Sequence, residues 1–155
     1  MTVRTSAGTT FALTATRPAT FDAAGYAAVG MTYTTVGEIT DLGEFGREYA
    51  LVTHQPLGNR STQKFKGSFN EGALSIQLAL NTDDAGQILM KSALLSDASH
   101  SCRVTTQNGD VYYFQAAVMS FRLGVGSVDQ ITTAAATLEI TTSAGGVGVV
   151  EVLAA

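Results

Sequence analysis

Residues 73–89 read ALSIQLALNTDDAGQIL, and their hydrophobic period lengthens partway along from that of a strand to that of a helix. A period of two predicts a strand with one buried face. We therefore expect a half-buried strand over residues 73–81 with a helix directly after it. The face expected to be buried carries Leu74, Ile76, Leu78 and Leu80.

The helix prediction covers about residues 83–96. Asn81 or Thr82 can cap its first turn, where the carboxylates of Asp83 and Asp84 suit the positive end of the helix dipole. We expect one apolar stripe to be buried against the strands and the helix to end near residues 96–98. That stripe consists of Ala85, Ile88, Leu89, Ser92 and Leu95.

Strand-like runs lie on both sides of these two elements. They cover residues 9–14, 32–42, 49–53 and 61–69 before them and residues 101–106, 110–121, 131–142 and 147–153 after them. Gly37 indicates a bulge in the second run, and Asn108-Gly109 is a strong hairpin signal. Phe65 and Phe69 are in phase, with the neighbouring lysines on the opposite face. This order predicts a mainly β fold, an antiparallel β-sandwich or barrel with one α-helix packed against it.

The length of 155 residues predicts one domain over residues 1–155. Residues 1–30, rich in Thr, Ala and Gly, are expected to form an N-terminal arm or edge segment. Residues 43–66 are expected to form an extended loop. Residues 144–155 are expected to form a C-terminal strand or tail.

The composition points to a protein that assembles. Charged residues make up only 14% of the chain, against roughly 25% in a typical soluble domain. So little charge protects a monomer poorly against self-association. The net charge of −4 argues against a dedicated nucleic-acid-binding protein, because such proteins carry a basic face.

Other features bear on where the protein is made. The single cysteine, Cys102, cannot form an intrachain disulfide. No apolar run approaches the roughly 20 residues that span a bilayer, so no membrane anchoring is expected. The first residues, Met1–Ser6, lack the apolar stretch of a signal peptide, and synthesis in a cytoplasm is the expectation.

Candidate catalytic groups are few. His100 and Cys102 share a face of a predicted strand, but no third group orients them. Asp83 and Asp84 adjoin no histidine, whereas a metal site needs three or four converging ligands. Gly124-Val125-Gly126 lacks the third glycine and the following helix of a phosphate-binding loop. We expect no catalytic site, no metal and no cofactor, and hence no enzyme.

The segment from residue 44 to residue 66 mixes aromatic and charged side chains. One interpretation is a solvated hairpin and loop. The other is an assembly arm, in which aromatic residues supply buried area and charges set the register with a neighbour. Acids among the bases make direct DNA binding the weaker possibility. The candidate interface residues are Glu44, Phe45, Arg47, Glu48, Tyr49, His54, Arg60, Lys64, Phe65 and Lys66.

A series of short motifs runs through the middle of the chain. It consists of Val36-Gly37-Glu38-Ile39-Thr40, Lys66-Gly67-Ser68-Phe69, Glu71-Gly72, Asp84-Ala85-Gly86-Gln87-Ile88-Leu89, Asn108-Gly109-Asp110, Tyr112-Tyr113-Phe114, Val118-Met119-Ser120-Phe121 and Leu138-Glu139-Ile140-Thr141. In order and spacing this series resembles the major tail tube proteins of siphophages. The resemblance covers roughly residues 30–142, and the two ends of the chain have no counterpart in it.

The resemblance implies a tail tube β-sandwich with one helix. Six copies would form a ring, and rings would stack into a tube through which phage DNA is ejected without specific binding. The segment 43–66 would contact the neighbouring subunit or the next ring. The implied partners are further copies of the chain and the tape measure, tail terminator and tail tip proteins. The implied setting is the virion tail of a phage, or a related particle such as a gene transfer agent, made in the host bacterial cytoplasm.

Two further expectations accompany this resemblance, one about the lumen and one about an alternative function. Glu38 and Asp41 are candidates for lining the lumen, because a neutral or acidic wall repels phosphate weakly. The alternative function is a virion decoration module or a carbohydrate- or protein-binding β-sandwich, since β-sandwiches serve many functions. Against that alternative, Tyr112 and Tyr113 point to opposite faces of one strand, and the chain has no tryptophan.

Overall fold

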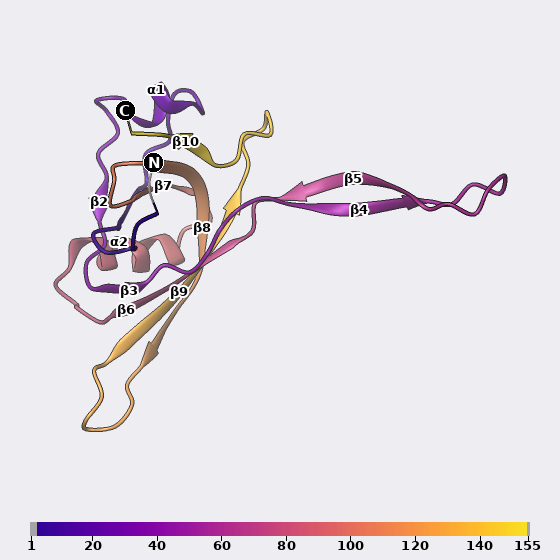
Figure 1. The fold of residues 1–155 in the computed structure, drawn as a ribbon. Coiled ribbons are helices and arrows are strands. Elements are labelled where there is room, and N and C mark those ends of the chain that lie inside the picture. The colour runs from indigo at the N-terminus through magenta and orange to yellow at the C-terminus, as the bar shows by residue number, and fades with distance from the viewer. Residues whose placement is uncertain (1–2, 155) are drawn as a thin grey trace.

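The computed structural model describes residues 3–154 as a curled β-sheet from which two ribbons project (Figure 1). Met1 and Thr2 of the expected N-terminal arm and Ala155 of the expected C-terminal segment lie outside the described residues. The main sheet contains β1 (Thr10–Thr14), β2 (Thr34–Thr35), β3 (Ile39–Asp41), β6 (Ala73–Ala79), β7 (His100–Thr105), β8 (Val111–Gly124), β9 (Thr133–Thr141) and β10 (Val150–Val152). The remaining elements are the paired strands β4 (Glu48–His54) and β5 (Gln63–Asn70) and the helices α1 (Ala23–Tyr26) and α2 (Ala85–Leu94).

The main sheet is antiparallel throughout. Its strands follow the order β2-β1-β7-β8-β9-β6-β3, and β10 pairs with β8. The expected hairpin at Asn108-Gly109 joins β7 to β8, where Gly109 has a φ of 93° and donates its amide proton to the Thr106 carbonyl at 3.0 Å. The predicted fold class, mainly β and antiparallel, is confirmed.

β2 and β3 end the sheet on opposite sides, although only Val36, Gly37 and Glu38 separate them in sequence. The prediction of one bulged strand over residues 32–42 is therefore wrong. Val36 donates its amide proton to Phe11 of β1 at 2.9 Å, whereas the carbonyl of Glu38 accepts from Ala79 of β6 at 2.9 Å. Glu38 also adopts a φ of 62°, which turns the chain. The curl of the sheet thus brings its two ends together at residues 36–38, which we call the crossing.

The hydrophobic core fills the inside of the curl. Strand β6 contributes Leu74, Ile76 and Leu78, all fully buried, as the period of two predicts. They pack with buried residues from the other strands, among them Phe11, Leu13, Val104, Phe114, Ala136 and Leu138. The core therefore fixes which face of each strand remains for other contacts.

Helix α2 packs on this core with a different face from the one predicted. Its buried residues are Gly86, Gln87, Met90 and Ala93, whereas Ile88 and Leu95 of the predicted stripe are exposed. Polar contacts determine which face of α2 is turned toward the core. The Gln87 side chain donates to the carbonyls of Gly37 (3.1 Å) and Ala79 (3.0 Å) and accepts from the Asn81 amide at 3.0 Å.

The start of α2 also differs from the prediction. Asp84, not Asn81 or Thr82, is the N-cap, and its carboxylate accepts from the Gln87 amide at 3.0 Å. Gly86 then lies against the backbone of β2, where a Cβ would collide with the Thr35 carbonyl. This close approach leaves room for no other residue type and brings the helix onto the crossing.

The N-terminal segment contributes an interior strand and a short helix. Strand β1 lies between β2 and β7, and its Phe11 and Leu13 are fully buried. Helix α1, which the sequence analysis did not expect, places Tyr26 against Tyr113 with ring centroids 5.3 Å apart. Gln115 donates to the Tyr26 hydroxyl at 3.2 Å. Residues of this segment therefore cover the outer face of β8.

Candidate assembly surfaces

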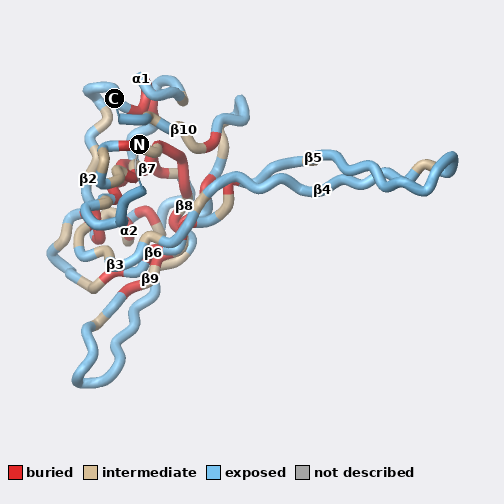
Figure 2. The backbone as a smooth tube through the Cα atoms, in the orientation of Figure 1, coloured by how far each residue is buried: buried red, intermediate tan, exposed pale blue. Residues whose placement is uncertain are grey.

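The β4–β5 ribbon projects far from the body of the protein (Figure 1). We call residues 48–70 the arm. Its two strands bond to each other in a sheet of their own, and nearly all its residues are exposed (Figure 2). The seven residues of β4 alone span about 23 Å at the usual rise of a strand. A ribbon of this length, exposed on both faces, can reach beyond the surface of its own subunit.

The structure divides the predicted interface residues among three places. Glu44 and Phe45 belong to the body, where the Phe45 ring lies 5.8 Å from that of Tyr112 and 5.5 Å from that of Phe114. Arg47, Glu48 and Tyr49 lie at the base of the arm. The outer part of the arm carries His54, Arg60, Lys64, Phe65 and Lys66, all exposed.

An ion pair fastens the base of the arm to the body. Arg47 binds Oε1 of Glu71 through Nε and Nη2, each at 2.7 Å, and only 3% of the Glu71 side chain is exposed. The Arg47 guanidinium also lies 3.9 Å from the ring centroid of Phe69. Arg47 precedes the arm and Glu71 follows it, so the pair joins the two ends of the arm. The sequence analysis missed Glu71, whose role depends on a contact 24 residues away.

A register shift places the side chains of the arm on different faces from those predicted. Val52 is opposite Phe65 and Leu51 opposite Lys66, but a shift between Tyr49 and Leu51 places Tyr49 opposite Phe69. Residues opposite each other share a face, so Phe69 lies on the face of Tyr49, Leu51 and Lys66 and away from Phe65. The expectation that Phe65 and Phe69 are in phase is wrong, because a bulge inserts an extra residue between them.

The arm is basic and the rest of the chain is acidic. Residues 48–70 contain three of the nine basic residues, Arg60, Lys64 and Lys66, and one of the thirteen acidic ones, Glu48. The rest of the sequence therefore holds six bases and twelve acids. Opposite charge on two parts of one chain favours contact between the arm of one copy and the body of another.

The face of the sheet opposite the core carries small and polar side chains. One row across β3, β6, β9 and β8 consists of Asp41, Gln77, Ala135 and Arg122, and the next consists of Ser75, Thr137 and Ser120. A third row consists of Ala73, Glu139 and Ala117. Of the two predicted lumen residues, Asp41 belongs to this face, whereas Glu38 lies in the crossing between β2 and β3.

Strand β8 has an open edge over its second half. Its pairing with β7 ends at Ala116, so from Ala117 to Gly124 it pairs with β9 alone among the described strands. At the other end of the sheet, β3 is the last strand. An open edge is a template for pairing with another chain. The strand at β8 was predicted from the sequence, but its open edge was not.

The far end of the β8–β9 ribbon also projects from the body (Figure 1). It is rich in exposed apolar side chains and carries one base, Arg122, and one acid, Asp129. The sequence analysis did not identify this surface. Its exposed apolar residues are Met119, Leu123, Val125, Val128 and Ile131.

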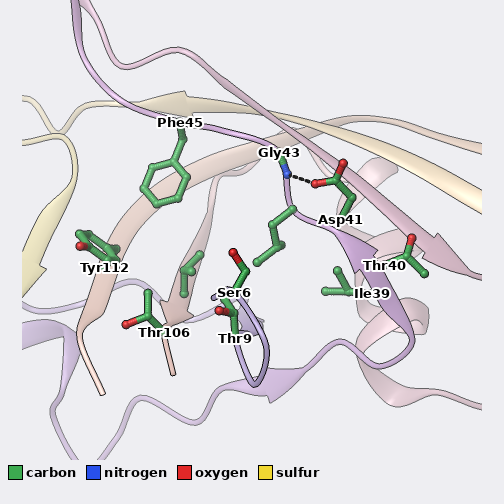
Figure 3. A pocket seen from close by; sticks show the side chains of 11 residues that line it. Ser6, Thr9, Ile39, Thr40, Asp41, Gly43, Phe45, Thr106 and Tyr112 are labelled. Carbon is green, nitrogen blue, oxygen red and sulfur yellow. Dashed lines mark hydrogen bonds between the residues drawn. The ribbon is translucent and has the colours of Figure 1, made fainter. Parts of the chain in front are cut away.

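A groove of about 300 Å³ lies among the N-terminal segment, β3, β7 and β8 (Figure 3). Hydroxyl groups and one carboxylate, that of Asp41, alternate with apolar residues around it. The Asp41 carboxylate accepts from the Gly43 amide at 2.8 Å. The other lining residues are Ser6, Thr9, Ile39, Thr40, Leu42, Phe45, Val104, Thr106 and Tyr112.

The candidate catalytic residues are not arranged for catalysis. Cys102 is fully buried, and burial raises the pKa of its thiol. His100 is also buried, with Nδ1 3.3 Å from the Ala98 carbonyl oxygen, whereas His54 lies on the arm. Across residues 3–154, no three His, Cys, Asp or Glu side chains are grouped to hold a metal. Within the same range, no helix has the length and apolar character to cross a membrane.

Comparison with known proteins shows the fold at low sequence identity. No protein-family model and no curated protein matches the chain. A chain in the cryo-EM structure of the anti-feeding prophage baseplate, 6-fold symmetrised, matches with a TM-score of 0.63 at 9% identity, over 91% of this chain and 94% of that one. A chain from the tail of an empty GTA particle, solved with C6 symmetry, matches with a TM-score of 0.58 at 11% identity, over 79% and 87%.

A third solved structure is a tail tube itself. The SPP1 tail tube, determined by solid-state NMR and cryo-EM, matches with a TM-score of 0.60 at 12% identity, over 92% of this chain and 75% of that one. The chain therefore has a tail-tube-like fold, as the resemblance in its sequence predicts.

Proposed function

We propose that this chain is a structural subunit that assembles into the tail tube of a phage or of a related particle such as a gene transfer agent. The observation that carries the proposal is a tail-tube-like fold with two open strand edges, one along the second half of β8 and one at β3, the last strand of the sheet. Open edges in a protein with little charge favour self-assembly over a monomeric existence. In this proposal the chain is made in the host bacterial cytoplasm, resides in the virion tail and has no catalytic site.

Ring closure would use these two open edges. The edge of β8 from Ala117 to Gly124 in one copy would lie beside the β3 end of the sheet in the next copy. Closing a set of sheets into one barrel removes their edges. We infer six copies in a ring, because the solved baseplate and GTA tail structures have sixfold symmetry.

The face opposite the core would line the lumen. Its three rows carry two acids, Asp41 and Glu139, and one base, Arg122, among small polar and apolar side chains. A weakly acidic wall repels phosphate weakly, so DNA would pass without being bound. Glu38 would lie near the margin of this face, since it directly precedes β3.

The arm would join each subunit to a neighbour in its ring or in the next ring. Its exposed aromatic and aliphatic side chains supply area to bury, and its three bases are opposite in charge to the acidic body of a neighbour. The N-terminal segment 1–30 and the C-terminal segment 144–155 would belong to the same tail tube domain. Tape measure, tail terminator and tail tip proteins would complete the particle.

The alternative, a carbohydrate- or protein-binding module, would need aromatic side chains free to stack on a ligand. Phe45 and Tyr112 line the groove of Figure 3, but their rings pack edge to face, 5.8 Å apart, and both are half-buried. No observation favours this alternative over assembly.

Electron microscopy of the purified chain tests the proposal. We expect stacked rings or tubes with a continuous central channel as the protein concentration rises, alone or after addition of tail tips that nucleate assembly. The proposal fails if the chain stays monomeric at every concentration and on tail tips. Symmetry measured in end views decides the number of copies in a ring.

A further inference from the structure

The outer face of α2 is apolar although it is exposed. Ile88 is 53% exposed, and Leu95, the C-cap, is 89% exposed and lies about two helical turns further on the same face. The sequence pattern predicts that this face is buried, yet the subunit leaves it in solvent. Exposed apolar patches mark contact sites, and conflicts between pattern and fold concentrate at functional surfaces.

Several contacts prevent the helix from turning this face inward. Gln87 is bonded to three backbone groups, those of Gly37, Ala79 and Asn81, and Asp84 accepts from the Gly37 amide at 3.1 Å. Gly86 lies so close to β2 that no side chain fits between them. The apolar face is therefore fixed outward and available to a partner.

Acidic residues flank α2 in sequence. Asp83 is exposed just before α2, and Asp97 is exposed just after it. The one base on the helix, Lys91, is half-buried, with Nζ 5.6 Å from the ring centroid of Phe121. We call Asp83, Ile88, Leu95 and Asp97 the helix patch. It presents two exposed apolar side chains, with the exposed Ser92 between them, and an acid next to each end of the helix in sequence.

We propose that the helix patch binds the arm of a second copy of the chain. This inference rests on the proposed self-assembly and names the surface that the arm meets. The arm has the complementary character, since it presents Lys64 and Lys66 beside the exposed Leu51. The β8–β9 ribbon is a weaker fit, because its one base is offset by one acid. In Figure 1 the arm extends away from α2, so the patch must receive the arm of another subunit.

Charge reversal in both partners tests this contact. The arm variant is Lys64→Glu with Lys66→Glu, and the patch variant is Asp83→Lys with Asp97→Lys. All four side chains are exposed, so the monomers should keep the thermal unfolding temperature of the wild type. Each double variant should need a protein concentration about tenfold higher than the wild type to form tubes. The chain with all four changes should assemble within about threefold of the wild-type concentration.

The outcomes separate this inference from the proposed function. If wild-type tubes form, two results overturn the helix patch as the binding site. One is a patch variant that assembles at the wild-type concentration, and the other is a chain with all four changes that assembles no better than the double variants. A wild type that never forms tubes overturns both. Tube formation near the wild-type concentration by the chain with all four changes supports the pairing of arm and patch.

The apolar part of the patch has its own test. Leu95→Gln should raise the concentration needed for tube formation about tenfold, because its side chain is buried only on assembly. Val29→Gln is the matched control, since Val29 is 102% exposed and lies outside the patch. An unchanged threshold for Leu95→Gln, or an equal rise for Val29→Gln, contradicts an apolar contact at this face.

Discussion

The carboxylate of Asp84 accepts the amide proton of Gly37 at 3.1 Å, which links the start of α2 to the crossing between the two ends of the sheet. The same oxygen accepts from the Gln87 amide at 3.0 Å, as a helix N-cap does. A single side chain thus fixes where the helix begins and where the chain turns between β2 and β3. Asp84 therefore contributes to closure of the curl alongside the apolar core.

We expect Asp84→Ala to lower the free energy of unfolding by about 1–3 kcal/mol, since it removes the cap and leaves the Gly37 amide without its partner. Urea denaturation followed by circular dichroism measures the change. Asp83→Ala is the control, because Asp83 is exposed, and it should change stability by less than about 0.5 kcal/mol. Equal effects of the two substitutions would show that the link to Gly37 contributes nothing.

Leu78→Asp should prevent folding, because an unpaired charge in the core costs several kcal/mol. Leu78 is fully buried on the core face of β6. Gln77→Asp is the matched control, since Gln77 is exposed on the opposite face of the same strand. The control should stay soluble with a cooperative thermal transition. A well-folded Leu78→Asp protein would be incompatible with this packing.

Where the pattern of residues alone decides the structure, the sequence predicts the fold correctly. The alternation in β6 and the Asn108-Gly109 turn depend on neighbours in the chain, and both predictions are confirmed. The rotation of α2 and the break at Glu38 depend on distant groups. A buried glutamine bonded to three backbone groups overrides an apolar stripe, and no pattern of neighbouring residues predicts these bonds.

In the candidate site, too, features set by neighbouring residues could be predicted and features set by distant contacts could not. The arm follows from strand patterns around a turn-rich segment, so its existence could be predicted. The bulge that separates Phe65 from Phe69, and the partner of Arg47, could not, because each depends on how two strands meet. The open edge of β8 was also beyond prediction, since it arises where the shorter β7 ends.

Removal of residues 50–68, with Asn-Gly joining Tyr49 to Phe69, should yield a folded monomer that forms no tubes. Tyr49 and Phe69 are opposite each other in the ladder, so a two-residue turn can close the shortened ribbon. The arm contributes nothing to the buried core, and the thermal unfolding temperature should change little. Size-exclusion chromatography and electron microscopy are the measurements. Normal tubes from this variant would refute an assembly role for the arm.

Cys102 should be inert to thiol reagents at pH 8 as long as the protein is folded. Burial raises the pKa of the thiol, so the reactive thiolate is not populated at that pH, and the reagent has no access. Labelling followed by mass spectrometry should proceed at the rate of unfolding and accelerate in urea. Ser75→Cys, at an exposed position of β6, is the control and should be labelled at once. Fast labelling of Cys102 in the native protein would contradict its burial.

Glu71→Gln should leave the arm attached but free to swing. The substitution keeps the size of a side chain that is almost wholly buried and removes the charge that Arg47 binds through two nitrogens. Spin labels at Leu57→Cys on the arm tip and Val29→Cys on the body report the arm's position, since both sites are fully exposed. We expect a broader distance distribution in Glu71→Gln than in the parent labelled protein.

Glu48→Gln is the control for loss of an acid at the arm base, because Glu48 is exposed and the ion pair of Arg47 is with Glu71. It should leave the distance distribution as narrow as that of the parent. If the neutral glutamine at position 71 also leaves the distribution unchanged, the ion pair of Arg47 with Glu71 does not set the position of the arm. A broadened distribution in Glu71→Gln alone assigns the arm's angle to the ion pair, because that pair is the contact this substitution weakens.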